Sequence, residues 1–500
     1  MSDPVDILII GFGAVGTIYG YILSQNEHVR VTAIARSSYA DMNQNGIRIE
    51  SEKFGIIDNW RPYRLVQDTA EANDRAYKYI IVSTKCLPDL LPTASILAPF
   101  LEEEQNQSID LEDGPTVILI QNGIGIEHGL QSAYPQVPII SVVAWIGANL
   151  KPGPRVTHGM LEKLIMGLYL GEGGDSPYGL ENVEGALTDS FFVCLLDDYA
   201  DPAGYRGPGG EERRKEGARR TNAFADLLKN GGGCAEVVED IQPKRYEKTV
   251  CTFAKAHAPR VWNAAWSSMC TLSRATVSAC VEPSVLPYTL PVVRRTMLEV
   301  IYVARAWGYH EDVLPLKCVD DAIKVTIKNY QRTSGGVPET PGTPGMRADA
   351  FGSLGYGFPT ESDDIDDSLE STVQFKPSML LDVEAGRPCE LEPIIGSLLD
   401  RARAKGVATP RLDMAYSALK VHQEMAVQKY AQSETYQTHI QNWITRVPNV
   451  AGLGAAGRQA WEKAVRRAQL AGHQAASVGM AGGKDKIPGK PIQISVGDEP

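Results

Sequence analysis

Three glycines near the beginning of the chain have the spacing of a phosphate-binding turn. The apolar run 7–10 ends at a hexapeptide with the pattern G-x-G-x-x-G, made of Gly11, Phe12, Gly13, Ala14, Val15 and Gly16. In a strand, turn and helix with this spacing, the first glycine forms the turn, the second lets the backbone approach a pyrophosphate, and the third allows close helix packing. Unpaired amide groups at the helix N-terminus then face the phosphates. The pattern predicts a dinucleotide site, although a glycine-rich turn without a ligand has the same sequence signature.

A cationic residue follows the next predicted strand, where nicotinamide sites distinguish their two cofactors. The β-branched run 29–35 predicts that strand, and Arg36 comes directly after it. NAD sites usually have Asp or Glu here, which binds the ribose 2′-hydroxyl. A guanidinium group suits a 2′-phosphate instead. We therefore expect NADPH/NADP+ as the cofactor, and the alternative is a surface arginine that contacts only water.

Lys85 and Asn122 are candidate site residues because of their positions after strands. They follow the predicted strands 79–83 and 116–120. Ligands of an open parallel sheet bind at the carboxyl ends of its strands, where both side chains would lie. Taken singly, a lysine after a strand is more often a solvated residue, and an Asn-Gly pair is more often a turn.

The elements that must position these residues divide the chain into two halves. A helix at 15–23 and a strand at 139–146 continue the α/β pattern to about residue 171. From Thr221 onward, helical periodicity dominates, with apolar stripes at 292–304 and 394–399 and a predicted helix at 411–430. The predicted fold class is an α/β Rossmann dinucleotide-binding domain followed by an all-helical C-terminal domain.

Composition shifts suggest four regions along the chain. We expect an NADP-binding Rossmann domain at 1–170, and an inserted loop and connection at 171–235, with periodicity lost from residue 171 to about residue 218. The helical domain at 236–430 would carry substrate and catalytic groups and is interrupted by an acidic loop at 334–373. Residues 431–500 are rich in Ala, Gly and Gln and predict a C-terminal extension of low order.

Composition also argues against several classes of function. The net charge of −12 over 500 residues argues against nucleic-acid binding, which needs a basic face. The chain opens without the basic and apolar regions of a signal peptide, and no apolar run is long enough to span a membrane. The eight cysteines are dispersed and have no metal-ligand spacing. We expect a cytoplasmic protein with reduced thiols, no metal and no membrane partner.

Five stretches together resemble the ketopantoate reductase family, the NADPH-dependent reductases of 2-dehydropantoate. The likeness covers about residues 5–170 and 236–430, and the family has a Rossmann domain followed by a helical domain with the active site between them. The last stretch is the most specific, because a serine, an acidic-glycine turn and a second glutamate stand at fixed offsets. The five stretches are GFGAVG from Gly11, VSTKCLPD around Lys85, IQNGIG around Asn122, WNAAWSSMCTL from Trp262 and PSMLLDVEAGRPCELEPIIG from Pro377.

The resemblance implies a proton donor and its support. Reduction of a 2-oxo acid needs a hydride donor and an acid for the developing alkoxide. The family's acid is a lysine, and the matching segment RYEK gives Lys248. By similarity, Lys85 and Glu390 support the cofactor side or this lysine, and Glu390 would keep the ammonium charged at neutral pH. Without the resemblance, Glu390 would be interpreted as a solvated turn residue.

The resemblance also implies a set of substrate-binding residues. Asn122 would lie beside nicotinamide and substrate, while Asn263 and Ser378 would hold substrate oxygens. From its local sequence alone, Ser378 would be a helix N-cap. Ser267 stands where many relatives have another asparagine, and losing that amide changes which substrate groups can be bound.

The chain departs from the family in the spacing of its lysine and asparagine. The family places them four residues apart on one helix face, whereas Lys248 and Asn263 are fifteen apart, or about 22 Å in an unbroken helix. Removing 251–261 would restore the spacing of four, which suggests an eleven-residue insertion that leaves the helix as a loop or arises from faulty splicing or gene prediction. If the insertion stayed helical, Lys248 would be out of reach. Lys255, eight residues before Asn263, would be a poor substitute at about 12 Å.

The resemblance implies NADPH-dependent reduction of 2-dehydropantoate (ketopantoate) to pantoate, a step of pantothenate biosynthesis. One alternative keeps the fold and cofactor but reduces another small 2-oxo acid or ketone, as Ser267 and the long loops would permit. Another alternative is a catalytically impaired NADP(H)-binding protein whose insertions serve as interaction surfaces. The helical stripes are compatible with a homodimer, and equally with an internal core.

Overall fold

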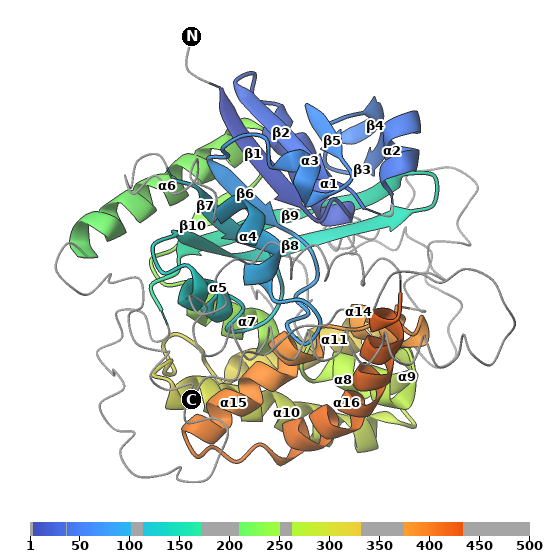
Figure 1. Cartoon of the computed structure of the whole chain (residues 1–500). Coiled ribbons are helices and arrows are strands. Elements are labelled where there is room, and N and C mark those ends of the chain that lie inside the picture. Colours follow the sequence, from blue (N-terminus) through green and yellow to red (C-terminus); the bar gives the residue numbers. More distant parts are fainter. Residues whose placement is uncertain are drawn as a thin grey trace, which may run out of the picture.

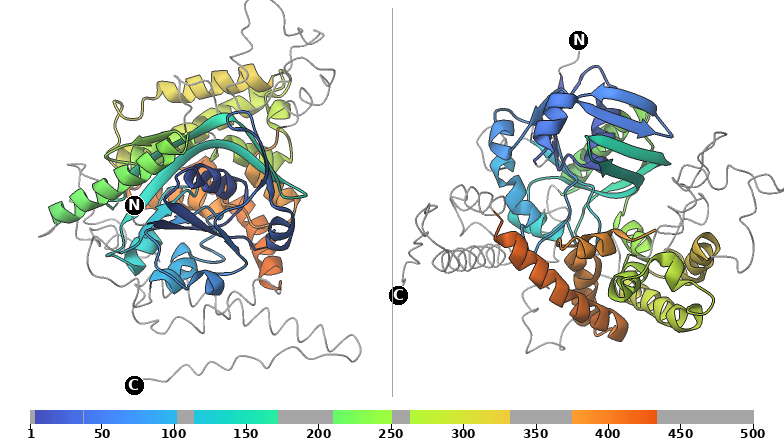
Figure 2. Two further views of the ribbon diagram at one scale, coloured as in Figure 1. Left: turned by 90° about the horizontal axis from the view of Figure 1, so that it is seen from above. Right: turned by 90° about the vertical axis from the view of Figure 1, so that its right-hand side faces the viewer.

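The protein consists of a sheet domain stacked on a helical domain (Figure 1). The structure is a computed structural model, and it describes residues 4–36, 38–101, 114–171, 210–250, 263–331 and 375–433. Within these residues, the expected α/β Rossmann domain followed by an all-helical region is confirmed. A side view shows the same two layers, with the orange and yellow-green parts of the helical domain lying side by side beneath the sheet (Figure 2, right).

Ten strands form one mixed sheet. Its spatial order is β4-β3-β9-β8-β7-β6-β1-β2-β5, and β10 pairs with β9. The strands are β1 (Val5–Ile10), β2 (Val29–Ile34), β3 (Ile47–Ser51), β4 (Gly55–Trp60), β5 (Arg64–Val66), β6 (Tyr79–Val82), β7 (Thr116–Leu119), β8 (Ile139–Lys151), β9 (Arg155–Leu168) and β10 (Ala235–Val237).

The Rossmann part of the sheet is parallel and buried. β1 pairs in parallel with both β2 and β6, and β6 pairs in parallel with β7. Every residue of β6 and β7 is buried, as expected for strands covered on both faces. The predicted strands after the glycine turn are confirmed within one residue at most ends, and the carboxyl ends of β1, β6 and β7 therefore lie side by side.

Two antiparallel hairpins extend the sheet beyond the expected pattern. β3 pairs with β4, and the long strands β8 and β9 pair from Ile140 with Leu168 to Lys151 with Arg155. The sequence predicted only the first part of β8. β9 is harder to recognise because Gly159, Glu162 and Lys163 interrupt its alternation.

Helices cover the sheet and build the lower domain. The helices of the sheet domain are α1 (Ala14–Ser24), α2 (Tyr39–Asn45), α3 (Thr69–Ala72), α4 (Thr93–Leu101), α5 (His128–Ala133) and α6 (Gly210–Asn230). Those of the helical domain are α7 (Gln242–Val250), α8 (Trp266–Ser273), α9 (Val277–Cys280), α10 (Leu286–Ala306), α11 (Lys317–Tyr330), α14 (Ser378–Glu384), the π-helical segment η3 (Glu392–Gly396), α15 (Ser397–Ala404) and α16 (Pro410–Ala431).

The expectation of an inserted loop and connection at 171–235 is wrong for its second half. Residues 210–230 form α6, which runs along the sheet in Figure 1, and 235–237 form β10 beside β9. The charged first turns of α6 hide an amphipathic pattern, because Phe224 and Leu228 are buried and Gly217 lies against Leu168. Residues 172–209 lie outside the described residues, as do the whole acidic loop 334–373 and most of the extension 431–500.

Separate apolar cores hold the two domains. The two largest clusters of buried residues in the described part of the sheet domain cover the two faces of its strands, and one large cluster fills the helical domain around Trp266, Met297 and Leu398. Ile124, from the loop after β7, belongs to the helical cluster. The loop after β7 is therefore packed into the other domain.

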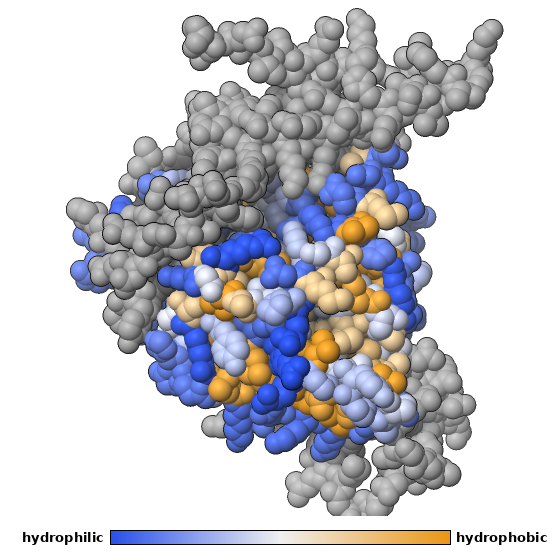
Figure 3. Space-filling model, turned by 90° about the horizontal axis from the view of Figure 1, so that it is seen from below, coloured by the Kyte–Doolittle hydropathy of each residue, from blue (hydrophilic) through white to orange (hydrophobic). Residues whose placement is uncertain are grey.

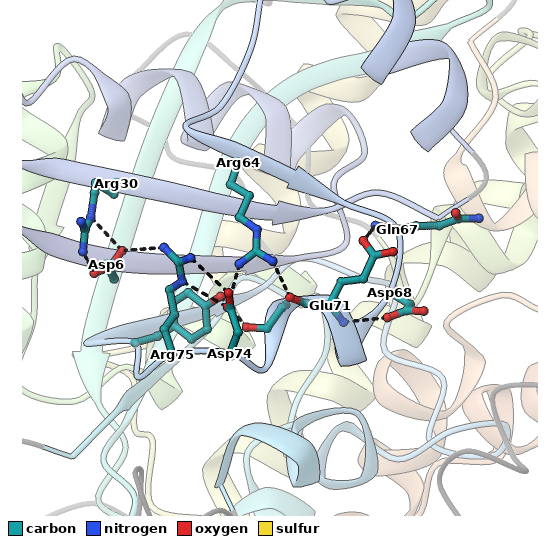
Figure 4. A network of polar contacts seen from close by, with 10 residues as sticks. Asp6, Arg30, Arg64, Gln67, Asp68, Glu71, Asp74 and Arg75 are labelled. Carbon is teal, nitrogen blue, oxygen red and sulfur yellow. Dashed lines mark hydrogen bonds and ion pairs between the residues drawn. The ribbon is translucent and has the colours of Figure 1, made fainter.

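The amino ends of the parallel strands have a network of charges (Figure 4). Arg30 on β2 binds Asp6 on β1, and Arg64 on β5 donates to Asp74, which also binds Arg75. The two guanidinium groups lower the pKa of Asp74 to about 2. This network lies at the edge opposite the strand ends that carry Lys85 and Asn122, and it joins neighbouring strands.

Five of the six cysteines in the described residues are free thiols, and one is disulfide-bonded. Cys86, Cys234, Cys270, Cys280 and Cys389 are free thiols. Cys318 is disulfide-bonded, which the dispersed cysteine pattern did not predict.

No helix in the described part of the chain is both long and apolar enough to cross a membrane.

Candidate active site

The glycine turn has the geometry that a pyrophosphate needs. Gly11 adopts φ +97°, and a Cβ there would lie 2.6 Å from the backbone nitrogen of Thr84. A Cβ on Gly16 would lie 2.6 Å from the carbonyl oxygen of Gly11, so only glycine permits this close approach. At Gly13, by contrast, a Cβ would meet nothing within 4 Å, and no side chain caps the N-terminus of α1. Open space at an uncapped helix N-terminus fits a phosphate group.

Arg36 lies two residues beyond β2 and has the freedom to bind an anion. Its side chain is exposed, and within the described ranges no carboxylate forms an ion pair with it. A guanidinium group at this strand end fits a ribose 2′-phosphate. Its role in cofactor choice stays a prediction.

Lys248 is the centre of the polar contacts between the domains. It comes from the last turn of α7, and its Nζ donates to Asn122 Oδ1 at 2.8 Å and to the carbonyl oxygen of Ala144 at 2.8 Å. The ammonium also lies 5.9 Å from the ring centre of Trp145. Burial and the nearby Arg245 lower the pKa of Lys248 to about 8, and Glu390 opposes this shift. The lysine therefore remains mostly protonated at neutral pH, but with an easily lost proton.

Asn122 joins Lys248 to Glu390. Its amide oxygen accepts from Lys248, while its Nδ2 donates to Glu390 Oε2 at 3.2 Å. Glu390 is buried, and its Oε1 accepts from the backbone N–H of Cys86 at 3.0 Å. Burial raises the pKa of Glu390, against the effect of these hydrogen bonds and of the lysines nearby. The contribution of Glu390 to the Lys248 pKa has the expected sign, although burial and Arg245 outweigh it.

A small pocket contains the candidate residues from both domains. The strand-end loop contributes Asn122, and the helical domain contributes Lys248 and Asn263. Its full lining is Gln121, Asn122, Gly123, Val142, Val143, Arg245, Lys248, Thr249, Asn263 and Ile394.

The pocket brings together the lysine and asparagine whose separation in sequence was unusual. α7 ends at Val250, residues 263–265 form a turn, and α8 begins at Trp266. A single straight helix would separate Lys248 and Asn263 by about 22 Å, which is incompatible with a shared small pocket. Lys248 and Asn263 nevertheless line the same pocket. The proposed insertion 251–261 and Lys255 lie outside the described residues.

Two predicted substrate residues do not line this pocket. Ser378 is exposed at the first position of α14, where Pro377 rather than Ser378 is the N-cap. Ser267 is buried in α8, and its carbonyl oxygen accepts a hydrogen bond from Thr271. Their roles in substrate binding stay predictions, and neither side chain reaches the pocket as it stands.

Comparison with known families identifies the chain. Residues 7–171 match the family described as "Ketopantoate reductase PanE/ApbA", and residues 255–423 match "Ketopantoate reductase PanE/ApbA C terminal". Together the two ranges cover more than half of the protein. The chain belongs to the ketopantoate reductase family.

Full-length relatives of this ketopantoate reductase family member have low identity to it. It is 25% identical over 431 residues to an uncharacterised protein of Saccharomyces cerevisiae, covering 83% of this chain and 92% of the relative. It is 23% identical over 416 residues to a 2-dehydropantoate 2-reductase of Nostoc, covering 82% and 93%. These values support the family and leave the substrate open.

Solved structures share the fold of the whole family member. A 2-dehydropantoate 2-reductase from Methylococcus capsulatus aligns with a TM-score of 0.54 and 22% identity, over 84% of this chain and 98% of the other. A D-mandelate dehydrogenase, solved with NADH and anilino(oxo)acetate, aligns with a TM-score of 0.53 and 16% identity, over 84% and 99%. The fold therefore occurs with more than one 2-oxo or 2-hydroxy acid chemistry.

The candidate site also contains an ion pair that the sequence did not predict. Lys85 binds both carboxylate oxygens of Asp382 on α14, and Arg387 donates to the same carboxylate at 3.0 Å. Lys85 thus contacts the helical domain directly, while its role toward the cofactor stays a prediction. Asp382 stands four residues after Ser378 in the motif that carried the resemblance, which was a signal for its importance.

The described residues of the candidate site offer groups for hydrogen bonding and proton transfer. Among the described residues, no three His, Cys, Asp or Glu side chains gather in a way that could hold a metal ion. The available groups are an ammonium with a lowered pKa, an amide, a buried carboxylate and an uncapped helix N-terminus. Such a set can bind a dinucleotide and donate a proton to a developing alkoxide.

Proposed function

We propose that this protein is an NADPH-dependent reductase of a small 2-oxo acid, with 2-dehydropantoate as the first candidate substrate and pantoate as its product. The observation that carries the proposal is the Lys248 ammonium, which lines a pocket beside the strand-end loop and has a pKa of about 8. A general acid with a pKa near the working pH both holds its proton and gives it up readily. The reaction would belong to pantothenate biosynthesis.

The residues of the glycine turn fit the dinucleotide that this reaction needs. Gly13 leaves open space at the N-terminus of α1, and Arg36 presents an exposed guanidinium group after β2. When bound, the reduced nicotinamide supplies the hydride. The chain's own contribution is to orient the cofactor and to protonate the substrate oxygen from Lys248 Nζ, while Asn122 keeps the ammonium in place.

The substrate is tested by following oxidation of NADPH by the purified full chain with 2-dehydropantoate and with a panel of other 2-oxo acids. Turnover with 2-dehydropantoate at the highest kcat/KM supports the first candidate. Turnover only with another acid supports a reductase of different specificity. NADPH binding without turnover would leave a catalytically impaired NADP(H)-binding protein.

The second candidate, a reductase of another 2-oxo acid or ketone, is favoured by the positions of Ser267 and Ser378. Neither side chain lines the pocket, so two expected substrate contacts are missing from it. The D-mandelate dehydrogenase with a similar fold was solved with anilino(oxo)acetate, an aryl-containing 2-oxo acid. The substrate panel should therefore include aryl 2-oxo acids.

The choice of NADPH over NADH is tested by Arg36→Glu. A carboxylate repels a 2′-phosphate and accepts a hydrogen bond from a 2′-hydroxyl, so we expect kcat/KM for NADPH to fall by about 10- to 100-fold and that for NADH to rise. Arg61→Glu is a matched control, because Arg61 binds backbone carbonyls at the end of α2. If the ratio of kcat/KM for NADPH to that for NADH is unchanged in Arg36→Glu, the role of Arg36 in cofactor choice is contradicted.

A further inference from the structure

Arg245 is a buried arginine that contacts the pocket from the helix that carries Lys248. Its side chain is 2% exposed, and it precedes Lys248 by three residues, so both lie on one side of α7. Its Nη1 donates to the carbonyl oxygen of Gln121 at 3.1 Å and to that of Gly123 at 2.9 Å. These two carbonyls stand on either side of Asn122.

The remaining contacts of Arg245 fix the plane of its guanidinium group. Nε donates to Ser141 Oγ at 2.7 Å, and Nη2 donates to the carbonyl oxygen of Val142 at 3.3 Å. Nε also lies 2.7 Å from Glu127 Oε1, whose side chain is fully buried. Arginine is suited to this arrangement because its planar fork donates in several directions at once, whereas a lysine ammonium is a single point charge.

Glu127 is itself held through one of its two carboxylate oxygens. Ser141 and Gln242 both donate to its Oε1, the latter at 3.3 Å. Burying an arginine and a glutamate removes both charges from water, a cost that their attraction often does not recover. A pair of this kind is therefore better explained by the arrangement it enforces than by stability alone.

We propose that Arg245, held by Glu127, is a positioning residue of this active site, which fixes the backbone around Asn122 and places a permanent positive charge next to Lys248. The proposal rests on the proposed function for its catalytic meaning. The geometry itself does not depend on which acid is reduced.

The charges around Lys248 give the proposal a measurable consequence. Within the described residues, the ionisable groups that act on its ammonium are Arg245 on the same helix and Glu390 after α14. β8 presents the Ala144 carbonyl and the Trp145 ring, and the strand-end loop presents Asn122, none of which titrates. Arg245 lowers the pKa of Lys248, so removing its charge raises that pKa.

The main test replaces both buried charges at once with Arg245→Met and Glu127→Gln. This avoids leaving an unpaired buried carboxylate, the usual cause of unfolding when one partner is removed. The pH dependence of Lys248 acylation by acetic anhydride is followed by mass spectrometry in the full chain, without substrate. We expect the midpoint of this pH dependence, here called the Lys248 midpoint, to rise by about one pH unit. An unchanged midpoint overturns the electrostatic part of the proposal.

Arg245→Lys distinguishes the effect of the positive charge from that of the hydrogen bonds made by the planar guanidinium group. It keeps a positive charge but cannot bind the Gln121 and Gly123 carbonyls and Ser141 together. We expect the Lys248 midpoint to stay near that of the original protein, while kcat falls by about 10-fold and the KM for NADPH is unchanged. Full kcat in this variant overturns the positioning of Asn122.

Arg220 provides a matched control for loss of a buried arginine. It is 3% exposed, pairs with Glu216 and donates to the Gly114 carbonyl and to Thr116 on the far side of the sheet domain. Arg220→Met with Glu216→Gln should lower the melting temperature without moving the Lys248 midpoint. If this control moves the midpoint as much as the main variant does, the shift is a general effect of destabilisation and the proposal fails.

The two proposals fail in different ways. If no 2-oxo acid is reduced but the Lys248 midpoint still rises in the charge-free variant, the proposed function is wrong and Arg245 still sets the environment of Lys248. If 2-dehydropantoate is reduced but neither the midpoint nor kcat responds to the Arg245 variants, the function stands and the inference about Arg245 is wrong.

Discussion

Side chains from three separate segments, Lys248, Asn122 and Glu390, form one chain of hydrogen bonds. Asn122 accepts from the amine of Lys248 and donates to Glu390, so one amide connects a cation to a buried carboxylate. A lysine donates only, and an ionised carboxylate accepts only, which fixes the orientation of the amide between them. The pKa of Lys248, about 8, follows from burial and from Arg245, with Glu390 acting in the opposite direction.

Lys248→Ala tests the proton donor. We expect kcat to fall by about 100-fold or more, because a positioned general acid contributes about that much, while the Kd for NADPH changes little. In the original protein, kcat should decrease as pH rises through about 8, since the acid loses its proton there. Stopped assays across pH and a fluorescence titration of NADPH provide the measurements.

The control for Lys248→Ala lies on the same helix. Lys244 pairs with Glu247 at 2.8 Å and does not line the pocket, so Lys244→Ala should keep most of the activity. An active Lys248→Ala, or equal losses in both variants, would remove Lys248 from the acid role.

The sequence predicted several residues of the site but not the hydrogen bonds and ion pairs between them. The resemblance indicated Lys248, Asn122, Asn263 and Glu390, and the structure brings all but Glu390 into one pocket lining, with Glu390 bound behind Asn122. It gave no sign of the pairing of Arg245 with Glu127, because those residues are 118 positions apart and meet only in the folded chain. The one available signal was the helical spacing of three between Arg245 and Lys248.

Among the elements, the loop after β7 carries more constraints than its length suggests. Gly123 adopts φ +110°, and a Cβ there would lie 2.4 Å from Pro393 Cβ and 2.6 Å from the Pro393 carbonyl oxygen. The next residue, Ile124, donates its N–H to that same carbonyl at 2.9 Å. The loop thus binds η3 of the helical domain while its other side carries Asn122.

Gly123→Ala tests this close approach. Because it combines a strained φ with contact against the Pro393 backbone, we expect the free energy of unfolding to fall by about 2 kcal/mol or more. Gly129→Ala on α5 is the control, since a Cβ there meets nothing within 4 Å and alanine favours helix. Chemical denaturation of both variants measures the difference, and equal stability of the two would contradict the constraint.

Deletion of 251–261 tests whether the segment between α7 and α8 is needed for activity. Joining Val250 to Trp262 would put Lys248 and Asn263 four residues apart, about 6 Å along one helix. Since both already line the same pocket, we expect the deletion to keep turnover and the midpoint of its pH dependence. An active full chain together with an inactive, folded deletion would show that the segment itself is required.

Element prediction succeeded where periodicity was simple. The parallel strands and the helices at 286–306 and 410–431 match the expected runs, because their apolar spacing is regular. The first half of α6 was missed because EERRKEGARR resembles a charged surface, and the buried residues of that half include Gly217 and Arg220 and no large apolar residue. Arg220 is buried there only because Glu216, Gly114 and Thr116 bind it.

For the whole molecule, polar contacts join the two domains around the site. Lys85 binds Asp382, Glu390 accepts from the Cys86 backbone, and Gln423 donates to Asp89 at 3.0 Å. Asp382 is 4% exposed, whereas Lys85 is 43% exposed, so the ion pair lies at the margin of the interface. Its partly buried position makes it stronger than a fully exposed pair.

Asp382→Asn tests whether this ion pair helps to hold the domains together. Loss of the charge should weaken contacts to both Lys85 and Arg387 and lower the free energy of unfolding by about 1–3 kcal/mol. Small-angle scattering should also detect a larger mean radius of gyration. Glu384→Gln, which breaks the Lys376 pair within the helical domain, is the control and should leave the radius unchanged.

The surface of the helical domain does not identify a partner. Seen from below, apolar residues are interspersed with hydrophilic ones (Figure 3). Met414, Val421 and Met425 on α16 are 72%, 62% and 65% exposed, and they lie on one side of that helix. Single exposed apolar residues are common on protein surfaces. The homodimer stays a prediction, which sedimentation velocity can test directly.

The acceptors of Lys248 have a consequence for how the protein could be monitored as it assembles. Both hydrogen bonds of the ammonium, to Asn122 and to the Ala144 carbonyl, end in the sheet domain, although the lysine belongs to the helical domain. In a chain whose halves have not yet docked, this amine is surrounded by water and has an ordinary lysine pKa. The rate at which Lys248 is acylated at pH 8 therefore reports docking of the two domains. The amine reacts slowly before the domains meet, and it reacts faster afterwards if the reagent can still reach it.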